Sequence, residues 1–117
     1  MRFNKSRAAD LIRQGRLLQA ALLDGEGMVV DTVGERYDPD RLAAVYFSSR
    51  TFAEELERDL ELGRTLEISF RSANQRMRLN VKRVGADGEN LTLVCLVPLP
   101  SLRLPSLKEL LMDEELP

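Results

Sequence analysis

The sequence contains no histidine and only one cysteine, Cys95. The absence of histidine excludes Ser-His-Asp triads and the common zinc ligand sets, and a lone cysteine excludes an intramolecular disulfide. Cys95 lies in the apolar run LTLVCLV, so we expect a buried core residue rather than a nucleophile. No GxxxxGK[ST] loop is present, which excludes a P-loop nucleotidase. We therefore expect no enzymatic activity, no cofactor and no metal ion.

Long apolar runs and an excess of positive charge are also missing. No apolar stretch approaches the ~18 residues that a membrane-spanning helix needs. The first residues, MRFNKSRAADLIRQGR, are charged and lack the apolar run of a signal peptide. With a net charge of −2, the chain has no overall positive field to attract nucleic acid or an anionic membrane. These absences indicate a cytoplasmic protein with no nucleic-acid partner and no membrane insertion.

The composition is that of one globular domain. The chain has 117 residues, of which 44% are hydrophobic and 31% charged, enough to bury a core without disulfides. Prolines at 98, 100 and 105 interrupt the chain near its end. We assign residues 1–104 to the domain and residues 105–117 to a C-terminal helix with an acidic tail.

Three segments carry helix signals. Residues 4–14 have one apolar face, a cap at Asn4 or Ser6 and a stop at Gly15. A long helix begins with Asp38 as N-cap and Pro39 at its first position, runs to about residue 61 and is ended by Gly63. One face of this helix is apolar, with two phenylalanines that widen it: Leu42, Val45, Tyr46, Ser49, Ala53, Leu56 and Leu60, with Phe47 and Phe52. A capping box, Ser106 to Glu109, opens the short last helix.

Five segments carry strand signals. Residues 17–24 and 91–97 are apolar on both faces, which is typical of central strands, and residues 28–33 pair with the first of these through a DGEG turn. Residues 65–71 and 76–83 alternate, so one face of each meets solvent. The patterns predict an α/β (α+β) fold with a five-stranded, mostly antiparallel sheet. In it the first and fifth strands are central, the second is at one edge, and the fourth and third lie toward the other. The long helix covers one face and the short terminal helices cover the other.

This order leaves the third strand, TLEISFR, at an edge with no proline or lysine to protect it. The strand lies beside a helix with more apolar surface than one sheet face needs. A twofold dimer that joins the two edge strands and packs helix on helix would cover both surfaces. The alternative is a monomer whose edge is shielded by twist and by Arg64 and Arg71.

The segment ALLDGEGMVVDTVG (21–34) is similar to the hairpin of the roadblock (dynein light chain) family, in which a strand, an Asp-Gly turn and a second strand precede a long helix. The order helix, two strands, long helix, three strands, helix matches that family across nearly the whole chain. The resemblance implies a non-catalytic homodimer or heterodimer that joins its sheets across the third strand and pairs its long helices. By position, the implied dimer interface is Val45, Ser49, Phe52, Leu56, Leu66, Ile68 and Phe70.

The resemblance also implies partners. Roadblock proteins regulate or scaffold Ras-like small GTPases or serve as dynein light chains, and bacterial members include the dimeric GTPase-activating partner of a polarity GTPase in gliding motility. The implied function is a module that binds and regulates a small GTPase in bacterial polarity or motility signalling. The alternative is an adaptor that links other polarity or signalling proteins without touching a GTPase.

Two further surfaces are open to more than one interpretation. The row Arg76, Arg78 and Lys82 is either a docking stripe for an acidic partner or a solvated strand face balanced by Glu67. The C-terminal leucines either cover the protein's own sheet or bind a partner, and their number favours the first: Leu102, Leu104, Leu107, Leu110 and Leu111.

Overall fold

A computed structural model describes residues 1–71, 73, 76–85, 90–99 and 104–112. Leu102, most of the turn expected at 86–90 and the acidic tail lie outside the described residues. The elements in chain order are α1 (Lys5–Arg13), β1 (Gln19–Leu23), β2 (Val29–Val33), α2 (Pro39–Leu60), β3 (Glu67–Arg71), β4 (Met77–Val84), β5 (Leu91–Pro98) and α3 (Leu107–Leu110).

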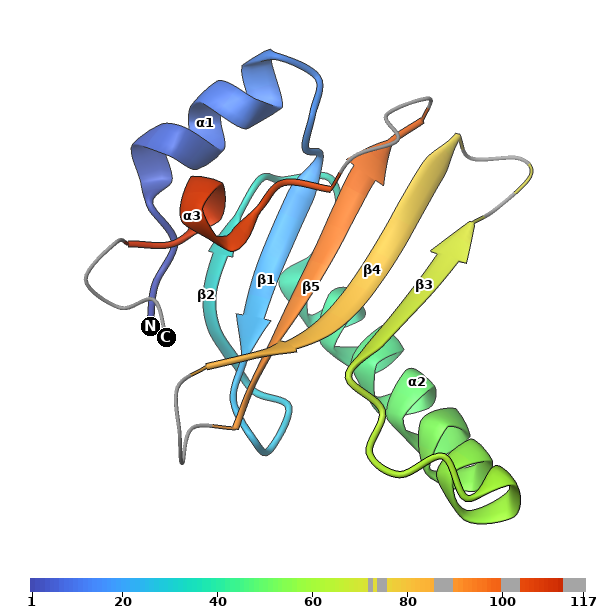
Figure 1. Cartoon of the computed structure of the whole chain (residues 1–117). Helices are drawn as coiled ribbons and strands as arrows, with labels where there is room; N and C mark the ends of the chain where they lie inside the picture. Colours follow the sequence, from blue (N-terminus) through green and yellow to red (C-terminus); the bar gives the residue numbers. More distant parts are fainter. Residues whose placement is uncertain (72, 74–75, 86–89, 100–103, 113–117) are drawn as a thin grey trace.

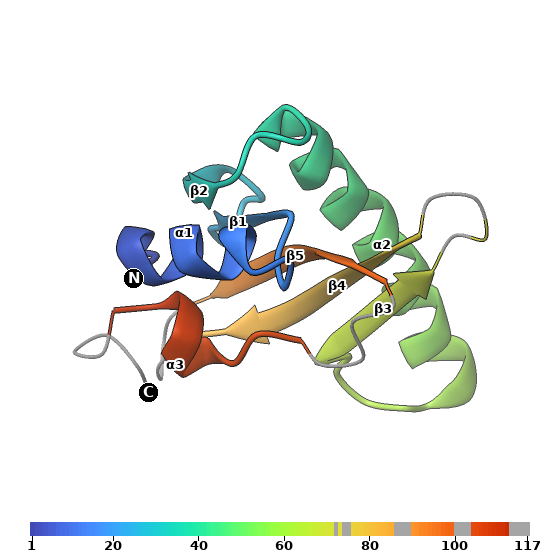
Figure 2. The same cartoon turned by 90° about the horizontal axis from the view of Figure 1, so that it is seen from above.

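The strands form one five-stranded sheet in the order β2-β1-β5-β4-β3, with every neighbouring pair antiparallel. The predicted fold class and strand order are confirmed. Helix α2 lies on one face of the sheet, and α1 and α3 lie together on the other (Figures 1 and 2). The apolar runs of β1 and β5 contribute side chains to two hydrophobic clusters, one on each face.

The local sequence explains where helices α1 and α2 begin and where α2 ends. The side chain of Asn4 accepts a hydrogen bond from Arg7 N and caps α1, whereas Asp38 caps α2 by accepting one from Asp40 N. Helix α2 ends at Leu60 because Glu61 adopts a left-handed conformation with φ 54°. The helix therefore ends within one residue of the predicted end at about residue 61, although its left-handed cap is Glu61 and not Gly63.

A buried glutamine fixes the approach to α2. Gln19, at the start of β1, is fully buried, and its side-chain amide donates to Tyr37 O at 2.6 Å and accepts from Tyr37 N at 2.8 Å. Both polar ends of the buried amide are therefore satisfied by one backbone residue. This pair holds the segment just before the α2 N-terminus against the central strand, which sets where the long helix starts over the sheet.

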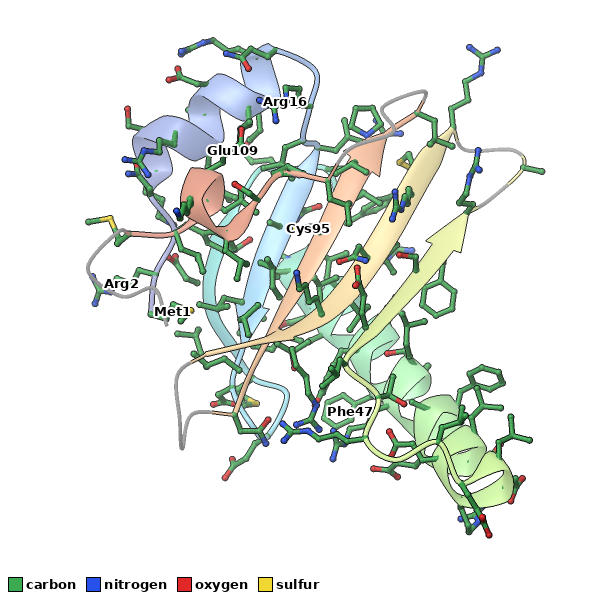
Figure 3. The ribbon with its side chains drawn as sticks, viewed as in Figure 1. Met1, Arg2, Arg16, Phe47, Cys95 and Glu109 are labelled. Carbon is green, nitrogen blue, oxygen red and sulfur yellow. The ribbon has the colours of Figure 1, made fainter. Side chains whose placement is uncertain are left out.

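The C-terminal segment packs on the protein's own sheet. Leu110 and Leu111 are fully buried in the same cluster as Phe3, Ala8 and Leu17. The ambiguity over these leucines is thereby resolved for the described residues, and the favoured interpretation is confirmed. Figure 3 shows the side chains of Arg16 and Glu109 between α1 and α3, where they form an ion pair of 2.9 Å.

Candidate protein-binding surface

Strand β3 has a free edge. Within the described part of the chain its one neighbour in the sheet is β4, to which it pairs through all five of its residues. Along the strand Ile68 is half-buried, and the rest are exposed, with Phe70 retaining 41% of its accessible surface. Just before the strand, Leu66 is 65% exposed. An apolar edge strand of this kind is a surface on which another strand can add.

Helix α2 extends past the sheet that it covers. The helix is 22 residues long, which corresponds to about 33 Å. Figure 1 shows its second half running behind β3 and beyond the sheet. Its buried residues all come from the stretch up to Ala53, whereas Phe52 is 55% and Leu60 is 60% exposed. The single apolar face expected from the sequence is thus covered by the sheet only in part.

A shallow apolar groove lies between α2 and the β3–β4 edge. Small side chains of α2, two phenylalanines and a leucine line it: Ala44, Val45, Ser48, Ser49, Phe52, Phe70 and Leu79. Four of the seven residues of the predicted dimer interface, namely Val45, Ser49, Phe52 and Phe70, meet in this groove. The structure therefore brings the helix and strand parts of the prediction into one surface.

The other predicted interface residues lie differently. Leu66 and Ile68 line a second hollow, under the later turns of α2, which Ser49 also borders. Leu56 is half-buried and lines neither hollow. Ser49 is buried, and its hydroxyl donates to Tyr46 O at 2.8 Å. Its hydroxyl is therefore already bonded within α2, so this residue contributes a small, close-packing surface rather than a free polar group.

The second hollow contains charged groups of both signs. Burial, reinforced by the nearby Arg64 and Arg50, lowers the pKa of the Arg83 guanidinium. Hydrogen bonding to Thr65, including Thr65 N to Glu57 Oε2 at 2.6 Å, lowers the pKa of the Glu57 carboxyl. The Thr65 bond ties the segment after α2 back onto the helix, so β3 is held at a defined distance from it.

The three residues of the basic stripe differ in their backbone conformation and exposure. Arg76 precedes β4 with φ 51°, Arg78 is half-buried, and Lys82 is exposed. Between them Asn80, which the alternation predicts as solvent-facing, is only 3% exposed. Its Nδ2 donates to Glu67 Oε1 at 2.6 Å and to Ser69 Oγ at 2.8 Å across the β3–β4 pair. The prediction for Asn80 is wrong because its cross-strand neighbours cover it.

Some residues of this surface were missed from the sequence. Ala44 and Ser48 are exposed and line the groove, and their four-residue spacing on a helix was an available signal. The exposure of two further apolar residues, Met28 and Phe47, was not predicted either. Phe47 is exposed (Figure 3), and its ring lies where a Cβ on Gly27 would stand; Met28, the next residue along the chain from Gly27, is also exposed.

Neither a metal site nor a membrane-spanning helix is found among the described residues. No cluster of three or more carboxylate or cysteine side chains in them could hold a metal ion. Within the same part of the chain, no helix has the length and apolar character needed to cross a membrane.

Comparison with known proteins identifies the fold. The chain matches Myxococcus xanthus MglB with a TM-score of 0.62 at 15% identity, over 81% of this chain and 75% of that one. It matches a Roadblock/LC7 domain from Streptomyces avermitilis with a TM-score of 0.59 at 18% identity, over 80% and 77%. It matches the gliding protein MglB from Thermus thermophilus with a TM-score of 0.57 at 21% identity, over 80% and 73%. No family model and no curated protein matches the sequence. The chain has the roadblock fold.

Proposed function

We propose that this protein is a non-catalytic, cytoplasmic roadblock module that forms a homodimer through α2 and β3. One observation carries the proposal: the free apolar edge of β3 adjoins the exposed apolar part of α2, with a groove between them. A second copy related by a twofold axis would add its own β3 to the edge and lay its own α2 along the groove. The interface would comprise Val45, Ser49, Phe52, Leu56, Leu66, Ile68 and Phe70.

Dimerisation would bury two surfaces together that are each unfavourable in water. Phe52 of α2 and Phe70 of β3 both line the groove and are 55% and 41% exposed in the single chain. Burying apolar surface contributes roughly 25 cal/mol per Å², and aromatic side chains contribute the largest areas. The same association pairs the backbone groups of the β3 edge, which are otherwise a site for aggregation.

We further propose that the dimer binds and regulates a Ras-like small GTPase in bacterial polarity or motility signalling. Two of the proteins that share the fold are MglB proteins, and one of these is described as a gliding protein. The resemblance of the hairpin and helix order to the roadblock family supports the same class of partner. The module would act by binding the GTPase and would catalyse no reaction alone.

Titration against a polarity-type small GTPase tests this proposal. The GTPase would be loaded with a non-hydrolysable GTP analogue or with GDP, and binding followed by fluorescence of a labelled nucleotide. We expect binding to the GTP-analogue form and weaker binding to the GDP form, with a change in the rate of GTP hydrolysis at saturation. Failure to bind either form would refute the GTPase part of the proposal and leave the dimer untouched.

A second function is supported by a different surface. Phe47 and Met28 expose apolar area at the β1–β2 turn, away from the β3 edge, and Arg78 and Lys82 give the strand face basic groups. These surfaces suit an adaptor that links other signalling proteins, with an acidic partner at the basic stripe Arg76, Arg78 and Lys82. Recovery of a scaffold or signalling protein in pull-downs, never of a GTPase, would favour this alternative.

A further inference from the structure

Strand β3 carries opposite charges at its two ends. Its five residues are Glu67, Ile68, Ser69, Phe70 and Arg71. Side chains alternate along a strand, so Glu67, Ser69 and Arg71 share the face away from α2, while Ile68 and Phe70 share the face toward it. The acidic end, the neutral centre and the basic end therefore lie in one row on the same face.

The backbone pattern shows which groups are free at the edge. Leu66 O accepts a hydrogen bond from Arg83 N at 2.9 Å, so Leu66 directs its backbone groups toward β4. In an antiparallel pair this direction alternates from one residue to the next. The N–H and C=O groups of Glu67, Ser69 and Arg71 therefore point away from β4, toward the free edge.

A twofold pair of β3 strands has one register that uses the whole strand. Pairing all five residues antiparallel places Ser69 opposite Ser69 of the second copy, at the axis. Glu67 then stands opposite Arg71 of the second copy, and Ile68 stands opposite Phe70. The free backbone groups of Glu67, Ser69 and Arg71 all find partners. Any shifted register leaves part of the strand unpaired and moves each Glu67 away from an Arg71.

Within one chain the charge of Arg71 is not balanced. Its cross-strand neighbour in β4 is Arg78, and like charges directly opposite one another are destabilising. Among the described residues none forms an ion pair with Arg71. Glu67 Oε1 accepts from Asn80, and the cross-strand neighbour of Glu67 is Lys82, although no ion pair joins Glu67 to Lys82 or to another described cation. A carboxylate placed beside Arg71 and a guanidinium placed beside Glu67 would each be favourable.

We propose that Glu67 and Arg71 are the residues by which this chain selects a second copy of itself. Each Glu67 pairs with Arg71 of the other copy, so the edge strand is complementary to itself in the register centred on Ser69. This inference rests on the dimer proposed above and adds its register and its basis for choosing a homodimer. A roadblock chain without this reciprocal charge order would be a poorer partner.

Charge reversal at either position tests the pairing. Glu67→Arg places two basic residues against each other at both ends of the interface, and Arg71→Glu does the same with two acids. Each change replaces two attractive cross-strand pairs with two repulsive ones, so we expect the dimer Kd to rise roughly tenfold to a hundredfold. The measurement is sedimentation equilibrium at low ionic strength, because salt screens exposed charges.

Mixing the two variants gives the sharper result. A heterodimer of Glu67→Arg with Arg71→Glu restores an opposite-charge pair at both ends, so native mass spectrometry should find it well above the statistical half. The double variant E67R/R71E should also regain a homodimer close to wild-type affinity. Statistical mixing, or a double variant as weak as the single ones, would overturn the proposed pairing.

The same set of variants includes controls for effects on protomer folding. Arg71→Glu puts a carboxylate opposite Arg78, so this variant should keep or gain protomer stability while its dimer weakens. Glu67→Gln removes the charge but can still accept from Asn80, so its dimer should weaken less than that of Glu67→Arg. A wild-type monomer would refute the proposed dimer itself. A wild-type dimer with unaffected variants would refute only the Glu67–Arg71 pairing.

Discussion

The backbone of Phe3 forms an antiparallel bridge with that of Leu111, so the beginning of the chain and the segment after α3 close the same face of the sheet. Asn4 N donates to Leu110 O at 2.7 Å, and Met112 N donates to Arg2 O at 3.2 Å. Together these bonds make a short two-stranded ribbon over the cluster that contains Leu17, Leu22 and Cys95. This cover closes the face of the sheet opposite α2 over the central strands, and it leaves α2, the groove and the β3 edge uncovered.

Leu110→Ala should destabilise the protein strongly. The side chain is fully buried between the N-terminal segment and the sheet, and a Leu-to-Ala change in a core costs about 2–5 kcal/mol. We expect this loss in the free energy of unfolding by urea denaturation, and a native-like groove in the remaining folded protein. Residues 105–117, which the sequence assigns to a separate segment, would on this account be needed for the full stability of residues 1–104.

The matched control for this prediction is Met28→Ala. Met28 is an apolar side chain that is mostly exposed, so its loss should change the unfolding free energy by no more than about 0.5 kcal/mol. Equal effects of the two substitutions would show that the C-terminal segment does not cover the core.

Asp31 should make this cover sensitive to acid. Burial raises the pKa of the Asp31 carboxyl, but hydrogen bonds from Lys5 Nζ, Phe3 N and Thr32 N outweigh it and hold the pKa below its ordinary value. The stabilisation is therefore complete above the unfolded-state pKa of about 4 and is lost as the pH falls through the lower folded-state pKa.

Asp31→Asn provides the measurement. Urea denaturation of wild type and variant at pH 7 and at pH 3 should show a stability difference that shrinks at the lower pH. The variant retains an oxygen that can accept from Phe3 N, so its fold should be preserved. A difference that stays constant between the two pH values would contradict the role assigned to the Asp31 carboxylate.

Cys95 should be unreactive in the folded protein. Burial raises the pKa of its thiol to about 12, and its side chain belongs to the cluster under α1 and α3 (Figure 3). Because the thiolate is the reactive form, a disulfide reagent such as DTNB at pH 8 should label Cys95 only after unfolding in urea. Rapid labelling of the native protein would indicate that the cover opens readily.

The sheet order was predictable from the sequence because burial on both faces requires apolar residues at successive positions. Residues 17–24 and 91–97 show this, and β1 and β5 are central. The helix caps were predictable for a similar reason, since Asn4 and Asp38 act through neighbours only a few residues away.

How far the sheet covers α2 was not predictable from the sequence. Helical periodicity groups Leu42 and Leu60 on related faces, but it does not say how far the sheet extends beneath the helix. Leu42 is buried and Leu60 is exposed because α2 extends beyond the edge of the sheet (Figure 1). Asn80 shows the same limit in a strand, since its burial depends on which residues of β3 stand opposite it.

The oligomeric state tests the central claim, a dimer formed through α2 and β3, most directly. Sedimentation equilibrium would compare wild type with Phe70→Glu, which places a charge in the groove, and with Met28→Glu, which alters an exposed apolar residue outside it. An unpaired buried carboxylate is costly, so the dimer Kd of Phe70→Glu should rise on the order of a hundredfold or more. We predict that wild type and Met28→Glu sediment at twice the 13.2 kDa chain mass and that Phe70→Glu sediments at 13.2 kDa. A monomeric wild type, or a Phe70→Glu dimer as tight as wild type, would contradict the account.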